Sequence, residues 1–91
     1  HTLLPKDYQA KLENEIAPAL EEMAAKFEVS KKRVSVKVGK PYQLICEKAV
    51  SIEADLIMLG THSEKGLTGM IGSTANSVAN YAECDVYLVN I

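Results

Sequence analysis

Leu56-Ile57-Met58-Leu59 and the segment after these residues decide the fold of this chain. An unbroken apolar run of this kind is typical of a strand that is buried on both faces of a parallel sheet. A segment with four glycines follows, Gly60-Thr61-His62-Ser63-Glu64-Lys65-Gly66-Leu67-Thr68-Gly69-Met70-Ile71-Gly72-Ser73-Thr74. Beyond it, apolar residues recur at the i, i+3, i+4, i+7 spacing of one helix face: Ala75, Val78, Ala79 and Ala82. A strand, a glycine-containing loop and a helix in this order are typical of a phosphate site, because glycines let an anion approach the backbone and the first helical amides have no intrahelical partner.

The rest of the chain alternates between helical and strand patterns. Apolar residues at spacings of three and four predict one amphipathic helix from about Lys6 to Phe27, kinked at Pro18, which has no amide hydrogen. A polar connection, Glu28 to Arg33, follows. We then expect, in chain order, a strand at Val34–Val38, a helix from Pro41 to about Ala54, the strand at Leu56–Leu59, a helix from Ser73 to about Ala82 and a strand at Val86–Val89.

This order predicts the α/β class. Strand, helix, strand, helix and strand with short links favour right-handed crossovers and a parallel sheet. We therefore predict a three-layer sheet in which Leu56–Leu59 is a central parallel strand with helices on both faces. Strict alternation in Val34–Val38 predicts an edge strand with one buried face.

In such sheets a ligand binds beyond the carboxyl ends of the strands, so loops starting at Gly39 and Gly60 are expected on one rim. Gly72 would allow a phosphate to approach the N-terminus of the helix closely. Ser73 could cap the helix or donate its hydroxyl to a phosphate, and the amides of Ser73 and Thr74 would add fixed dipoles. Alternatively, the glycines only shape the loop and Ser73 only caps. His62 is either a phosphate donor or a surface residue, and Lys65 either offsets phosphate charge or is solvated.

The same residues resemble a known family. Ala54–His62, Gly72–Asn76 and Glu83–Val89 are similar to the C-terminal half of a universal stress protein, a resemblance that covers the chain from about Val34 onward. It implies a doubly wound, flavodoxin-like domain of the adenine-nucleotide α-hydrolase type, with all 91 residues in a single, incomplete domain. It also implies that a preceding strand–helix–strand unit is absent here, so we expect the whole molecule to be longer at its N-terminus.

Nucleotide-binding members of that family carry G-x-x-G, nine residues and G-[ST]. Gly60, Gly72 and Ser73 match this pattern, and His62 matches the residue usual before the second glycine. Ser63 replaces that second glycine, and only eight residues separate it from Gly72. The shortened loop looks more like the branch named after the founding member, for which ATP binding is not the rule.

The composition of the chain argues against several classes of function. A formal net charge of −2 gives no electrostatic reason to expect nucleic acid or an anionic membrane as a partner. No apolar stretch approaches the roughly 20 residues that span a bilayer. Cys46 and Cys84 have no metal-ligand spacing, and we interpret them as reduced, partly buried thiols of a cytoplasmic protein. No catalytic constellation or metal cluster is visible, so we assign no catalytic residue and no enzyme activity.

Two functions remain open. One is a dimeric interaction module for stress regulation, with a degenerate or weak nucleotide-phosphate loop at Gly60–Thr74. The other is a domain that binds ATP or AMP through the same loop. We further predict a homodimer through Val86–Ile91, because the last strand is apolar on both faces and has no charge or proline to protect its edge, and because the resemblance implies a twofold contact.

Overall fold

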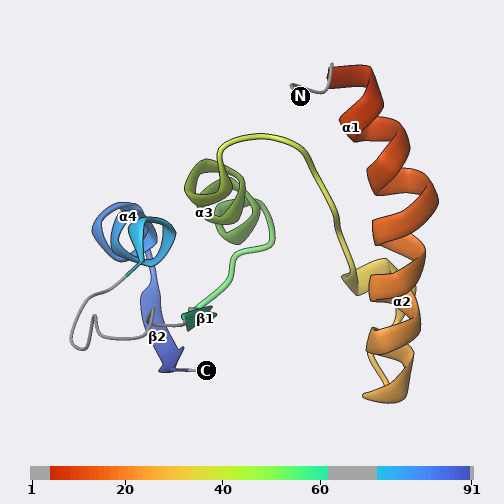
Figure 1. Cartoon of the computed structure of the whole chain (residues 1–91). Helices are drawn as coiled ribbons and strands as arrows, with labels where there is room; N and C mark the ends of the chain where they lie inside the picture. The colour runs from red at the N-terminus through yellow and green to blue at the C-terminus, as the bar shows by residue number, and fades with distance from the viewer. Residues whose placement is uncertain (1–4, 62–71, 91) are drawn as a thin grey trace. The chain divides into compact units, whose positions relative to one another are not determined.

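A computed structural model describes residues 5–61 and 72–90 of the chain (Figure 1). The chain folds as two compact units, one ending at Val38 and one starting at Gly39. Among the described residues, no helix combines the length and the apolar composition needed to cross a bilayer.

The first unit is built on the expected N-terminal helix, which has an irregular middle. It comprises α1 (Pro5–Lys11), the π-helical segment η1 (Leu12–Ile16) and α2 (Ala17–Lys26). The amide of Ala17 donates to the carbonyl of Leu12, five residues back, which is the π-helical pattern. Pro18 explains this local widening, since its ring would crowd the carbonyl four residues earlier and it has no hydrogen to donate. The irregularity that the structure shows is thus the π-helical segment Leu12–Ile16, just before Pro18, and the expected kink at Pro18 itself stays a prediction.

The end of α2 is a Schellman motif. Val29 donates its amide to the Ala24 carbonyl at 2.9 Å and Glu28 donates to Ala25 at 3.1 Å. Glu28 has a φ of 61°, the left-handed conformation that this motif requires. The polar connection then contains a short 3₁₀ helix, η2 (Lys31–Arg33), in which the Ser30 hydroxyl accepts from the Lys32 amide.

The predicted strand at Val34–Val38 is wrong. These residues form neither a helix nor a strand, and the described sheet has only two strands, both in the second unit. Alternation of apolar residues shows which side chains could be buried, but a strand also needs a neighbouring backbone to pair with. No described segment supplies that neighbour.

The second unit carries the elements predicted around the glycine loop. They are α3 (Pro41–Ser51), β1 (Leu56–Thr61), α4 (Ser73–Tyr81) and β2 (Asp85–Asn90). β1 and β2 are parallel, with Leu56 opposite Asp85 and Thr61 opposite Asn90. The α/β class with a parallel sheet is therefore confirmed. Both strands extend beyond their predicted C-terminal ends, because backbone pairing continues past the apolar runs.

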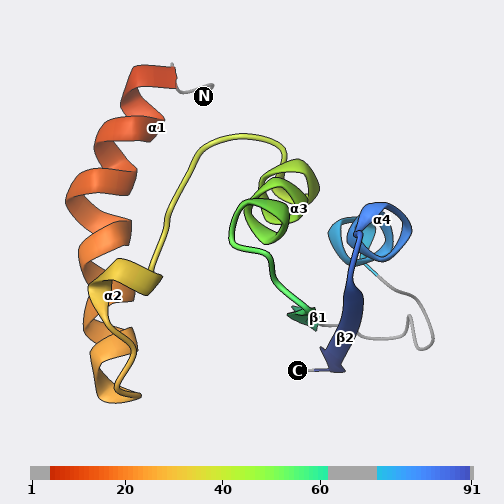
Figure 2. The ribbon, with the colours of Figure 1, turned by 180° about the vertical axis from the view of Figure 1, so that it is seen from behind.

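A small core holds this unit together. Ala49 of α3, Ile57 of β1 and Val78 of α4 are its buried residues, and Val78 is fully enclosed. Figures 1 and 2 show both helices on the same side of the strands. Between the helices, the rings of Tyr42 and Tyr81 lie 5.5 Å apart at their centroids.

The opposite face of the strands is open in the described residues. Leu56, Met58 and Tyr87 are 49%, 66% and 57% exposed, respectively. The expected second helical layer therefore does not cover this face within the second unit. β1 also pairs with β2 alone, so its predicted central place in a wider sheet is not seen among the described residues.

Candidate functional site

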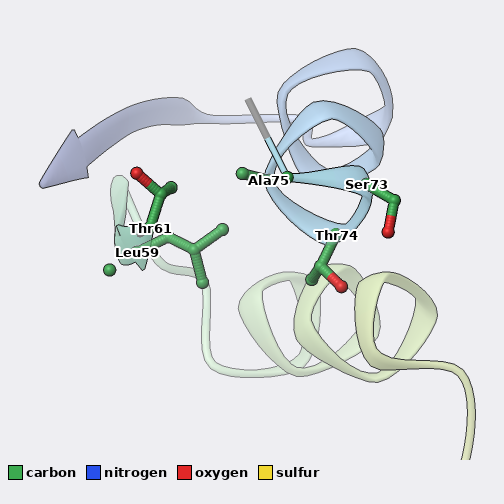
Figure 3. Close-up of a pocket in the computed structure, with 7 residues that line it drawn as sticks. Leu59, Thr61, Ser73, Thr74 and Ala75 are labelled. Carbon is green, nitrogen blue, oxygen red and sulfur yellow. The ribbon is translucent and has the colours of Figure 1, made fainter. Parts of the chain in front are cut away.

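An open hollow of about 250 Å³ lies where β1 ends and α4 begins. It is the place that the sequence predicts for a phosphate, and Figure 3 shows the side chains around it. Seven residues line it: Leu59, Gly60, Thr61, Gly72, Ser73, Thr74 and Ala75. Segments separated by ten intervening residues thus meet at one site, because β1 and α4 pack against each other through Ile57 and Val78.

The strand side of the hollow is formed by the last three residues of β1. Gly60 is part of the strand, opposite Val89, and so lies at the end of β1 where the loop was expected to begin. Leu59 is partly buried and packs against the core, whereas Gly60 is exposed. The strand side is therefore anchored in the core and includes a residue with no side chain at the mouth of the hollow.

The helix side is formed by the first turn of α4, and its cap differs from the prediction. Gly72 occupies the N-cap position, with φ −60° and ψ 155°, and Ser73 is the first helical residue. The Ser73 hydroxyl is thus not the cap, since the cap position is set by where the backbone turns and not by which nearby side chain caps best. Gly72 has no side chain to accept a hydrogen bond, and no side-chain cap is present.

This cap leaves the first amides of the helix unsatisfied by the helix itself. The first backbone hydrogen bond of α4 runs from the Asn76 amide to the Gly72 carbonyl, at 2.9 Å. The amides of Ser73, Thr74 and Ala75 precede it, so they have no intrahelical acceptor. Together with the positive end of the helix dipole, they make a backbone site suited to an anion.

Within the described residues, neither the conformation of Gly72 nor its surroundings require a glycine at this position. Its φ is one that any residue adopts, and a Cβ added there would meet no atom of the described residues within 4 Å. Gly39 is different: its φ is 156°, and a Cβ would lie 3.1 Å from the Leu44 side chain. Among the described residues, the backbone conformation and the packing therefore require glycine at Gly39 but not at Gly72. Gly39 is not among the residues that line the hollow, so the rim shared with Gly60 is not seen.

The side chains of the first turn point in different directions (Figure 3). In this view Ser73 lies on the side of α4 away from Leu59 and Thr61, and Ala75 points toward the strand. An anion held between strand and helix would accordingly meet backbone amides before it met the Ser73 hydroxyl. All seven lining residues are uncharged, so the described part of the site offers hydrogen bonds and a dipole but no formal positive charge.

Several predicted residues fall outside the part of the chain that the structure describes. His62, Ser63 and Lys65 belong to residues 62–71, and their roles stay predictions. Within the described ranges, no three His, Cys, Asp or Glu side chains gather as metal ligands would. Cys46 and Cys84 are free and half-buried, and both pack against the core of the second unit.

Three residues that line the hollow were not among the predicted site residues: Leu59, Thr61 and Ala75. Leu59 had been assigned only to the buried strand. Thr61 could have been found from its place directly after Gly60 at the end of a strand. Ala75 was assigned to the buried helix face, and it does have that role, since it is only 3% exposed. Its position in the first turn also gives it an amide at the site.

Comparison with known proteins places this geometry in a family. The model of the universal stress protein family matches residues 2–90, which is further toward the N-terminus than the resemblance from about Val34 had indicated. Universal stress protein A homolog 2 of Coxiella burnetii is 36% identical over 85 residues, covering 93% of this chain and 58% of the relative. Universal stress protein A homolog 1 of the same organism is 35% identical over 78 residues, which cover 86% of this chain and 54% of the relative. Universal stress protein E of Salmonella typhi is 27% identical over 86 residues, which cover 93% of this chain and 27% of the relative. The chain thus spans little more than half the length of its Coxiella relatives.

Proposed function

Because this chain belongs to the universal stress protein family, we propose that it is a stress-response regulatory domain that acts as a dimeric interaction module. The module carries a weak phosphate site at the hollow between β1 and α4. The two parts of this proposal depend on different residues, so they can be tested separately. A cytoplasmic location and the absence of a catalytic role remain part of the proposal.

The observation that supports the dimer is the edge of β2. This strand pairs with β1 along one side, and no other described strand lies along its second side. Tyr87 is 57% exposed, and Val86, Leu88 and Val89 are only half-buried. Between Val86 and Val89 this edge has no charge and no proline, so it is a template for another strand. Pairing with β2 of a second copy would satisfy its free backbone groups. The segment that we assign to this contact is Val86–Ile91, of which Ile91 lies outside the described residues.

The dimer is tested by placing a charge on that edge. Val89→Lys in the full-length protein should give a monomer by light scattering at roughly tens of micromolar, a concentration where an ordinary contact is populated. Val50→Lys on α3 is the matched control, since Val50 is 55% exposed and distant in sequence from β2. The control should remain dimeric. A wild-type protein that is monomeric under these conditions would contradict the dimer, and so would a Val89→Lys variant that stays dimeric.

A second function, binding of ATP or AMP, is favoured by one specific observation. The N-terminus of α4 opens on the hollow, and among the described residues no side chain caps its first turn and no atom lies within 4 Å of a Cβ built at Gly72. The residues proposed to contact phosphate are Gly60, His62, Ser63, Gly72, Ser73 and Thr74. The amides of Ser73 and Thr74 supply the contacts that depend least on side chains. Ser63 and the shortened loop weaken the case for a whole nucleotide, so this function ranks second.

Mass spectrometry of the purified protein separates the two functions. The full-length protein is denatured and any small molecule released from it is identified by mass. Release of ATP or AMP in near-equal amount to the protein would make nucleotide binding the primary function. Release of none, together with no heat on titration with ATP, would support the interaction module.

A further inference from the structure

We draw no further inference here: the strongest candidate, the exposed apolar face of the β1–β2 sheet formed by Leu56, Met58 and Tyr87, carries none because nothing in the part of the chain that the structure describes shows what covers it.

Discussion

Gly72→Asp should make the protein more stable while it weakens anion binding. Gly72 is the N-cap of α4, its φ of −60° suits any residue, and an added Cβ would meet no described residue within 4 Å. An aspartate there places a carboxylate where it can accept from the amides of Thr74 or Ala75. The same carboxylate would occupy the position of a bound phosphate and repel it.

The gain in stability follows from two contributions. Aspartate at an N-cap is better than glycine by a few tenths of a kcal/mol, and a negative charge at a helix N-terminus adds about 0.3–1 kcal/mol. The sum, about 0.5–1.3 kcal/mol, raises the midpoint of thermal unfolding by about 2–10 °C for a domain of 60–100 residues. Circular dichroism during heating measures it.

The loss of binding is larger. Two unit charges about 4 Å apart repel by about 1 kcal/mol in water and by about 4 kcal/mol near a protein surface. The dissociation constant for inorganic phosphate or ATP should therefore rise at least about fivefold, which corresponds to about 1 kcal/mol. Isothermal titration calorimetry on the full-length protein measures this change.

Gly72→Asn is the matched control, because asparagine caps as well as aspartate but has no charge. It should have a smaller gain in stability and a smaller loss of binding. The pair of variants separates the effect of occupying the amides from the effect of charge. Undiminished binding in Gly72→Asp would show that the anion lies elsewhere, and a lower unfolding midpoint would show that residue 72 is not the cap.

Three further predictions concern the first turn, the loop and the end of α3. Ser73→Ala should change the affinity for phosphate by less than about threefold, because the Ser73 side chain lies away from the strand in Figure 3 and the backbone amide is retained. A tenfold loss of affinity measured by calorimetry would show that the Ser73 hydroxyl is a ligand. Ser63→Gly with one residue inserted before Gly72 should strengthen ATP binding in the same assay if loop length limits it, and unchanged affinity would exclude that cause. Glu53→Gly should stabilise the protein by about 0.5–1 kcal/mol, because Glu53 follows α3 with a φ of 54°, a left-handed value that glycine adopts without steric strain. The control is Glu47→Gly inside α3, which should destabilise the protein by about 1 kcal/mol. Equal effects of these two glycines on the unfolding midpoint would contradict the assignment of the left-handed position.

The elements near the glycine loop could be predicted from sequence because their signals are local. An apolar run such as Leu56–Leu59 and a helical period such as that after Ser73 arise from the residues that form the element. The predicted first and last residues of these elements were less accurate, because strand pairing and helix capping depend on the backbone conformation. Thus Gly60 and Thr61 belong to β1, and Gly72 caps α4 although Ser73 is the better capping residue by type.

Features that depend on a distant partner or on strain could not be predicted. Val34–Val38 has the alternation of a strand but no described partner. Glu53 occupies the left-handed position after α3, where glycine is the usual residue, so its type gave no sign of the motif. There the Ala54 amide donates to the Ala49 carbonyl at 2.8 Å, and the bond from the Glu53 amide to the Val50 carbonyl holds the same turn. A single sequence shows which residues favour a conformation, but not where packing imposes one that they disfavour.

Phosphate binding by the backbone amides of α4 and nucleotide binding by the loop can be distinguished experimentally, and the distinction decides between the two proposed functions. The amides of Ser73, Thr74 and Ala75 have no acceptor within the helix because they precede its first hydrogen bond. We expect the replacement of a loop glycine by Ser63 to leave this helix start unchanged. Recognition of a whole nucleotide needs further contacts, and in the family pattern these depend on the length and glycines of the loop. We therefore expect inorganic phosphate to bind at α4 with an affinity that does not depend on residue 63, and ATP to bind with one that does. If loop repair strengthened both ligands equally, the loop would act by shaping the helix N-terminus itself, and the two functions would rest on one element.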